Sequence, residues 1–214
     1  MELKLNIPNS LNEITLGQYQ EFEKLDLTNE SKVHLKMIEI FCNVPEIVAR
    51  NIKATDVAEI CGIINNMFET KHQLINSFKL EGQEYSFIPS LQDMSFGEYI
   101  DLDTFIGDTE NLHRAMNVLY RPIELKQGKR YTLKEYDPES NEIAKDFPLD
   151  AVLGAIVFFY SLGKDLSLTM MNSLDKANQE TLAQHLISHP NMDGTTASLQ
   201  SLTGILQSLN ISLN

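Results

Sequence analysis

Apolar residues along most of the chain recur three or four positions apart, which is the spacing of amphipathic helices. Six segments carry this pattern clearly: 15–25, 31–41, 55–75, 95–105, 108–120 and 148–163. A short helix after Pro45 and one or two helices between Lys164 and His189 are also expected. Ala151 to Leu162 is apolar on nearly all sides, so this helix should be the most buried one, with Gly163 as its C-cap.

Three short segments show the alternation of a β-strand instead. Residues 2–7 alternate apolar and polar side chains up to Pro8, and residues 77–81 and 84–88 form a hairpin pattern around Gly82. These strands predict a small antiparallel element. The expected class is therefore mainly α (α+β), with about eight helices. The segment 123–147 shows no clear period and is expected to be irregular.

Two stretches of the chain, 7–22 and 88–102, have nearly the same sequence. Ile-Pro, Ser-Leu, Gly and Tyr recur at matching offsets, with Asn9 as one inserted residue. Thr15 to Gln18 and Ser95 to Glu98 each fit a capping box, in which two side chains satisfy free backbone N–H groups at a helix start. Internal duplication would place Tyr19 and Tyr99 in equivalent environments, whereas convergence on the same capping pattern would not.

The charge balance narrows the range of functions. The 214 residues include 30 acids and 17 bases, for a formal net charge of −13. Phosphate contacts require clustered Lys and Arg, so no direct nucleic-acid partner is expected. Two cysteines, Cys42 and Cys61, lie in apolar helical patterns and should be buried thiols. No signal-peptide core and no apolar stretch long enough for a membrane span is present, which favours the cytosol and no membrane partner.

The residues offer no arrangement that predicts catalysis, a cofactor or a metal. Leu80 to His113 contains eight acids and no Lys or Arg. A calcium loop starting at Asp101 would need an oxygen ligand at 105 and Gly at 106, where the chain has Phe and Ile. Solvated helix ends explain these acids better, particularly Asp108 and Glu110 in a first turn. An acidic surface around Asp101 and Asp103 that meets a basic partner is also favoured over a metal site. We therefore expect a protein that is not an enzyme.

The last 25 residues form a second candidate contact. They contain a single charge, Asp193, and a series of leucines at helical spacing: Leu199, Leu202, Leu206 and Leu209. A leucine stripe of this kind requires an apolar partner, which is either the core of the same chain or another subunit. The expected organisation is a helical domain over 1–189 and an uncharged docking segment over 190–214.

Several of these stretches resemble a group of tailed-bacteriophage proteins of unassigned role, found among virion-morphogenesis genes including those of crAss-like phages. They are residues 78–94 (FKLEGQEYSFIPSLQDM), 95–123 (SFGEYIDLDTFIGDTENLHRAMNVLYRPI) and 150–166 (DAVLGAIVFFYSLGKDL). Residues 14–22 (ITLGQYQEF), near the start of the chain, belong to the same resemblance. The resemblance implies a non-enzymatic structural or assembly protein of the neck, tail or capsid cargo. Its partners would be other phage structural proteins or further copies of itself.

The resemblance implies a location as well: the host cytoplasm during assembly, then the virion. It carries over no functional residues. The alternative is a tail-assembly chaperone that binds the tape-measure protein and is absent from the finished particle.

Overall fold

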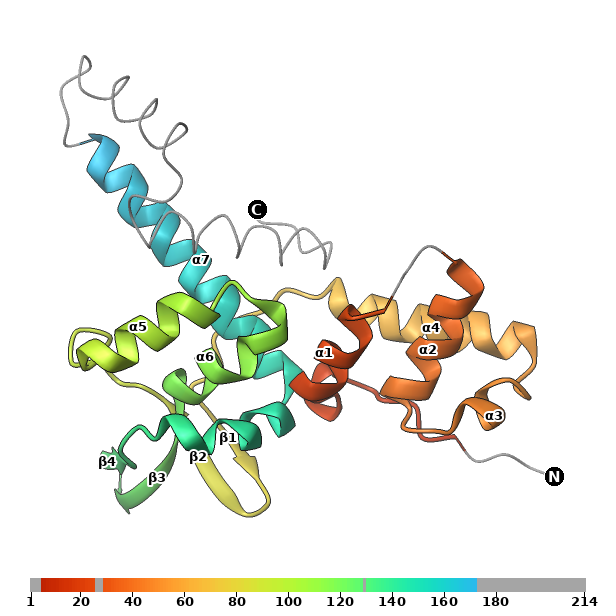
Figure 1. Cartoon of the computed structure of the whole chain (residues 1–214), viewed down its shortest axis with the longest axis horizontal. Helices are drawn as coiled ribbons and strands as arrows, with labels where there is room; N and C mark the ends of the chain where they lie inside the picture. The colour runs from red at the N-terminus through yellow and green to blue at the C-terminus, as the bar shows by residue number, and fades with distance from the viewer. Residues whose placement is uncertain (1–4, 26–28, 129, 173–214) are drawn as a thin grey trace.

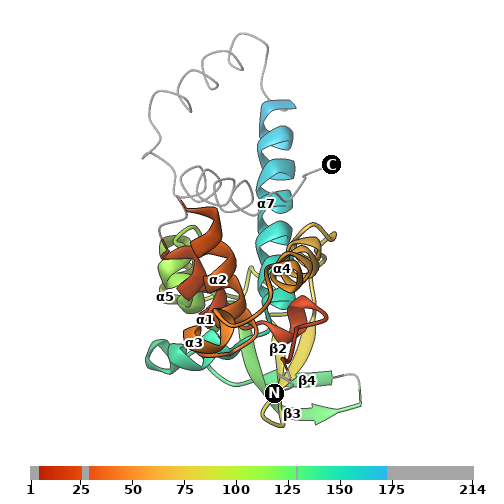
Figure 2. The ribbon, with the colours of Figure 1, turned by 90° about the vertical axis from the view of Figure 1, so that its right-hand side faces the viewer.

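The computed structural model describes residues 5–25, 29–128 and 130–172, with side chains to 165. These residues form a mainly helical α+β structure in which the buried apolar side chains make one cluster. The helices within residues 16–68 lie at one end, and the sheet and the helices within residues 77–133 lie at the other (Figure 1). Helix α7 (Leu149–Asn172) begins between the two groups and extends beyond both of them (Figures 1 and 2).

Four helices form the N-terminal group, after a 3-10 turn η1 (Leu11–Glu13): α1 (Leu16–Glu23), α2 (Glu30–Phe41), α3 (Glu46–Ala49) and α4 (Ala54–Phe68). Their aromatic rings meet at the centre, where the ring centres of Phe22 and Phe41 lie 5.1 Å apart. Gln20 connects this group to the other one. Its buried side-chain amide donates to the carbonyls of Thr109 at 2.7 Å and Glu110 at 2.9 Å.

The sheet has four antiparallel strands in the order β1 (Ser77–Leu80), β2 (Gln83–Phe87), β3 (Tyr120–Gln127) and β4 (Arg130–Leu133). Glu81 and Gly82 both have positive φ, as a two-residue hairpin turn requires. β3 pairs with β2 only through residues 120–122. Because Pro122 has no N–H, it cannot donate to this ladder, and beyond it β3 pairs with β4.

The remaining helical elements surround this sheet. They are α5 (Phe96–Phe105), η2 (Thr109–Asn111), α6 (Leu112–Leu119) and η3 (Pro138–Asp146). Every residue of α6 except Arg114 is buried, and η3 packs beside this helix. α6 leads directly into β3, so the end of this helix fixes where β3 begins.

The start of α7 is the centre of the structure. Ala151, Val152, Leu153, Ala155 and Ile156 are fully buried. Two backbone hydrogen bonds join this start to that of α1, from Leu149 to Ile14 and from Leu16 to Phe147. Phe147 also contacts the aromatic rings of the sheet, Phe78 at 5.0 Å and Tyr85 at 5.1 Å.

The extended segment 71–76 crosses α7 at close range. Gly154 has no Cβ, and an added Cβ would collide with the carbonyl oxygen of Gln73. The buried Tyr120 hydroxyl connects the same two segments, since it donates at 2.8 Å to Ile75 and lies 3.2 Å from the carbonyl of Ala151. One glycine and one hydroxyl therefore set the approach of the segment to the helix.

The predicted set of strands does not match the sheet. The hairpin is present, with β1 and β2 within a residue of their expected ends. The described part of the expected strand 2–7, residues 5–7, belongs to no strand. Leu5 and Ile7 pack beside α4 instead, which gives their alternating side chains an apolar neighbour without strand pairing. Neither β3 nor β4 was predicted. β4 lies within the segment 123–147 that was expected to be irregular, and β3 begins just before it.

Several helix boundaries also differ from the expectation. α4 ends at Phe68 rather than near residue 75. Just after this end, the Thr70 hydroxyl donates to the carbonyl of Met67, and the chain turns toward the sheet. α7 continues through Gly163 to Asn172, since a glycine permits a helix to end but does not force it to. Only the first part of Ala151 to Leu162 is fully buried, and Leu162 is 43% exposed. Both cysteines are buried, as expected.

The repeated sequence produces the same local structure twice. Both capping boxes form, at the starts of α1 and α5. The prediction of matching tyrosine environments is wrong, because Tyr19 is 1% exposed and Tyr99 is 46% exposed. The shared residues therefore specify the helix starts rather than the packing of the helices.

We predict that Gly154→Ala destabilises the protein by about 1–3 kcal/mol, because the new methyl group collides with the backbone at Gln73. Gly62→Ala is the matched control. Gly62 lies inside α4 with no atom within 4 Å of an added Cβ, so this change should be neutral or stabilise by up to about 1 kcal/mol. Denaturant titration measures both, and equal stability of the two variants would contradict the close crossing.

Candidate protein-interaction surface

Helix α5 is inverted over its first turns, residues 96–101, relative to an ordinary surface helix. Its inward positions include two carboxylates, Glu98 and Asp101, beside Leu102 and Phe105. Its outward positions include three large apolar side chains, Phe96, Tyr99 and Ile100. A soluble helix usually presents the opposite arrangement, with charges toward water and apolar groups toward the core.

Glu98 is stabilised in its buried position by two partners. One carboxylate oxygen accepts from the Ser95 backbone N–H at 2.6 Å, which is half of the capping box. The other lies 2.8 Å from a terminal nitrogen of Arg121, and both side chains of the pair are largely buried. Arg121 comes from β3, so this ion pair fixes the start of α5 against the sheet.

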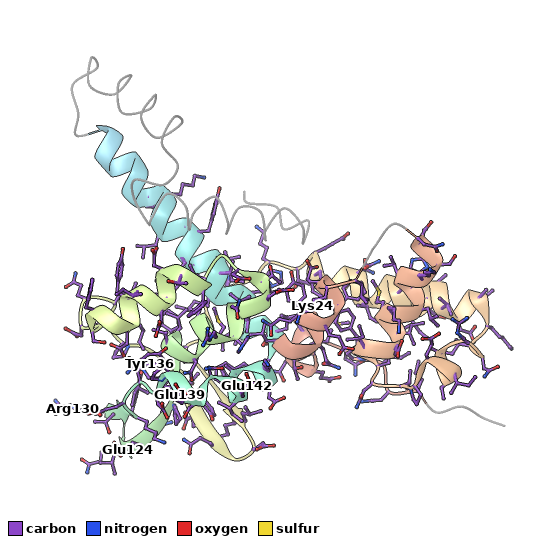
Figure 3. All side chains as sticks on the ribbon, in the orientation of Figure 1. Lys24, Glu124, Arg130, Tyr136, Glu139 and Glu142 are labelled. Atoms are coloured by element: carbon purple, nitrogen blue, oxygen red, sulfur yellow. The ribbon has the colours of Figure 1, made fainter. Side chains whose placement is uncertain are left out.

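Asp101 is held one turn further along the helix. Its carboxylate accepts a hydrogen bond at 2.8 Å from the hydroxyl of Tyr136. Tyr136, labelled in Figure 3, lies on the segment between β4 and η3. Burial, and then this bond to Asp101, hold the pKa of Tyr136 well above its usual value. The Arg114 guanidinium lies 4.5 Å from the centre of the Phe105 ring and secures the last turn.

The outward side of α5 carries a connected apolar stripe. Phe96 is 78% exposed, Tyr99 46% and Ile100 45%, and their spacing of three and four residues places them on one face. Asp103 falls seven residues after Phe96, at the end of the same stripe. We call Phe96, Tyr99, Ile100 and Asp103 the outer face of α5. Clustered apolar exposure of this kind is typical of protein-interaction sites.

The structure separates the two acids that were predicted to form a contact. Asp101 points inward to Tyr136, and Asp103 is half-buried on the outward side. The other predicted contact residues, Leu199, Leu202, Leu206 and Leu209, lie outside the described residues. Sequence reasoning missed the apolar residues of the outer face. Phe96 and Tyr99 belong to the stretch that repeats residues 7–22, in which the corresponding tyrosine, Tyr19, is buried. The acids at 98 and 101, one turn apart, were the available signal of the inversion.

Two hollows occur elsewhere on the described surface. One, of about 370 Å³, lies between η1, the end of α4 and the start of α7, and includes His72 and Asp150. Burial lowers the pKa of His72 and raises that of Asp150, so each is shifted toward its neutral form. The other, of about 430 Å³, lies between Leu5, Ile7 and α4. Neither hollow contains a nucleophile hydrogen-bonded to a base.

Residues 5–25, 29–128 and 130–172 contain no group of three or more His, Cys, Asp or Glu side chains that could hold a metal ion. Within the same ranges, no helix combines the length and apolar character needed to cross a membrane. Burial raises the pKa of the Cys42 thiol to about 11, with a smaller contribution from Cys61, so Cys42 is a poor nucleophile.

Comparison with known proteins gives no match to a family model, a curated protein or a solved structure. The site is therefore defined by its own geometry. That geometry is an exposed apolar face of α5, on a helix whose inner side is fixed by polar contacts to Arg121 and Tyr136.

We predict that Glu98→Gln destabilises the protein by about 3–5 kcal/mol, because it leaves the buried Arg121 charge without its partner while glutamine can still cap the helix. Glu84→Gln, which breaks the more exposed pair with Lys126, is the control and should cost about 0–1 kcal/mol. Chemical denaturation distinguishes the two. Similar losses for both variants would show that the Glu98 pair does not fix α5.

Proposed function

We propose that this chain is a non-enzymatic bacteriophage structural or assembly protein that acts through protein–protein contacts in the virion. The resemblance of residues 78–123 and 150–166 to phage virion-morphogenesis proteins supports the phage assignment. The outer face of α5 supports the mode of action. The protein would be present in the host cytoplasm during assembly and then in the neck, tail or capsid cargo of the particle.

The inversion of α5 is the observation that carries the proposal. Exposing Phe96 and Ile100 while burying Glu98 costs free energy in an isolated chain, since burial of such an apolar side chain contributes about 1.5–3 kcal/mol. A partner that covers the stripe recovers this contribution. The carboxylates on the inner side hold the helix in place, so the apolar side chains are presented without rearrangement.

A tail-assembly chaperone is the second candidate. Such a protein would use the same apolar face to hold the tape-measure protein and would leave before the particle is complete. Both functions require the outer face of α5, and they differ in whether the chain remains in the finished virion.

Phe96→Ser combined with Tyr99→Ser tests the proposal. Both side chains are exposed, so we expect the free energy of unfolding to change by no more than about 0.5 kcal/mol for each. When phage that lack their own copy of this protein are supplied with the double variant, the variant should be absent from virions or the yield of particles should fall. Mass spectrometry of purified virions measures the incorporation.

Ile47→Ser is the matched control, since Ile47 is 68% exposed on α3, away from α5. This variant should be incorporated like the wild type. If the wild type is absent from virions and the α5 variant still blocks assembly, the chaperone function is supported instead. Normal assembly with the α5 variant would contradict both functions.

The C-terminal segment remains a second proposed contact, based on its sequence alone. We predict that deletion of residues 195–214 leaves the folded core intact, as measured by circular dichroism, but abolishes incorporation into particles or co-purification with a phage partner. Loss of folding would assign the segment to the core. Folding with normal incorporation would remove it from the interface.

A further inference from the structure

The hairpin of β3 and β4 extends away from the rest of the sheet (Figure 2). Past Pro122, β3 pairs with β4 and no longer with β2, and β4 is an edge strand. A bulge between Ile123 and Leu125 bends the hairpin at the point where it leaves β2. Edge hairpins of this kind expose backbone and side chains to other molecules.

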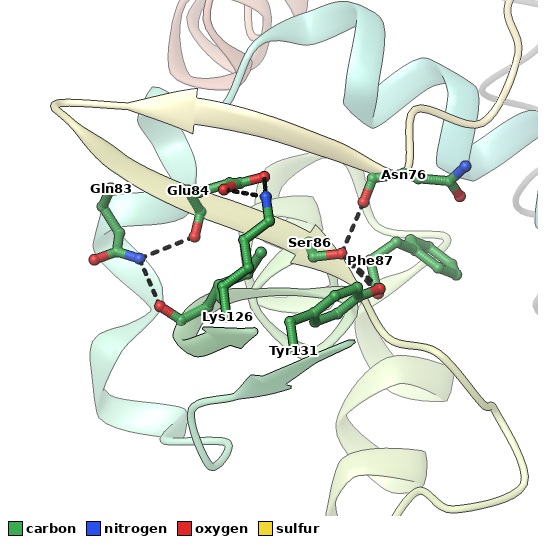
Figure 4. A network of polar contacts seen from close by, with 8 residues as sticks. Asn76, Gln83, Glu84, Ser86, Phe87, Lys126 and Tyr131 are labelled. Carbon is green, nitrogen blue, oxygen red and sulfur yellow. Dashed lines mark hydrogen bonds and ion pairs between the residues drawn. The ribbon is translucent and has the colours of Figure 1, made fainter. Parts of the chain in front are cut away.

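One face of the hairpin is fixed against β2 (Figure 4). Lys126 places its ammonium 2.6 and 2.7 Å from the two carboxylate oxygens of Glu84. On the opposite strand, the hydroxyl of Tyr131 accepts a hydrogen bond from that of Ser86 at 3.0 Å. These contacts give the protruding hairpin a defined orientation.

The opposite face is apolar and basic. Leu125 and Thr132 are paired across the strands, as are Gln127 and Arg130, so alternation places all four on this face. Leu125 is 63% exposed, and Arg130 and Lys134 are exposed as well (Figure 3 shows Arg130 at the edge of the molecule). We call Leu125, Gln127, Arg130, Thr132 and Lys134 the outer face of the hairpin.

This basic surface is exceptional in a chain with a net charge of −13. It contains two bases, Arg130 and Lys134, and no acid, whereas Lys126 lies on the opposite face and pairs with Glu84. The outer face of α5 has one acid, Asp103, and no base beside its three exposed apolar side chains.

We propose that the outer face of the hairpin binds the outer face of α5 of a second copy of this chain. This rests on the proposed function, because it names the partner of the same α5 surface. Leu125 would pack against Phe96 and Ile100, and Arg130 would approach Asp103. Complementary charge around an apolar centre is the usual composition of a specific interface.

A nucleic acid is the weaker occupant of the hairpin. It would meet a leucine at the centre of the surface and an acidic protein on all sides, and it would leave the α5 stripe uncovered. A second copy covers both surfaces together. Because the two surfaces are different, the copies form a reciprocal dimer, a ring or an open chain.

Two variants test the proposal, Phe96→Ser, which removes the α5 surface, and Leu125→Ser, which removes the hairpin surface. The wild-type full chain should self-associate at low salt, as measured by light scattering after size-exclusion chromatography. Each variant alone should associate at least about tenfold more weakly. Mixed together they should form a heterodimer, because one variant retains the hairpin and the other retains α5.

Charge reversal adds a second readout. Arg130→Glu should weaken self-association, and Asp103→Lys in the same chain should restore it in part, whereas Lys32→Glu, an equal charge change on α2, should have no effect. A mixture of the two serine variants that stays monomeric would overturn the proposal. So would a monomeric wild type whose hairpin binds a DNA or RNA oligonucleotide.

The proposed function and this inference fail separately. A monomeric wild type whose Phe96→Ser variant is excluded from virions refutes self-association but retains the phage contact, made then to another protein. Self-association with normal virion assembly by all variants retains this inference and refutes the proposed role of α5 in the particle.

Discussion

The close crossing of α7 by the segment 71–76 is the constraint on which the rest of the structure depends. Gly154 allows the backbone of Gln73 to lie against the helix, and the Tyr120 hydroxyl donates to the carbonyl of Ile75 while it lies 3.2 Å from the carbonyl of Ala151. The segment leads directly into β1, so the crossing sets the position of the sheet relative to α7. The bonds between Leu149 and Ile14 and between Leu16 and Phe147 add α1 to the same centre.

The interaction surface follows from this arrangement. Tyr120 fixes the start of β3, and the next residue, Arg121, reaches α5 and pairs with Glu98. A helix held by carboxylates on its inner side has its remaining apolar residues on the outer side. The protruding hairpin has the same origin, since Pro122 ends the pairing of β3 with β2 immediately after these contacts.

Local sequence signals predicted much of the fold. Capping residues located the starts of α1 and α5, apolar spacing identified α2 and α6, and Gly82 located the first hairpin. β3 and β4 were missed because Pro122 and the charged residues after it resemble a loop, and only the bulged pairing makes them strands. The end of α4 was missed because Leu74 and Ile75 fall seven residues after Met67 and Phe68, where a continued helix would place them on the same face, but the segment 71–76 is extended where it crosses α7.

The candidate site was harder to predict for a related reason. Sequence reasoning places acids at the surface and aromatic residues in the core, which is correct for Tyr19 and wrong for Phe96 and Tyr99. The inversion depends on Arg121 and Tyr136, which come from other elements and whose approach to α5 no local pattern reports.

The central claim is that the outer face of α5 is covered when the protein acts. Hydroxyl-radical footprinting of Phe96 and Tyr99, read by mass spectrometry, tests it directly in the dilute isolated chain and in purified assembly intermediates. The account predicts high reactivity of both residues in the isolated chain and strong protection in the intermediates, with Ile47 reactive in both samples. Equal reactivity of Phe96 and Tyr99 in the two samples would contradict it.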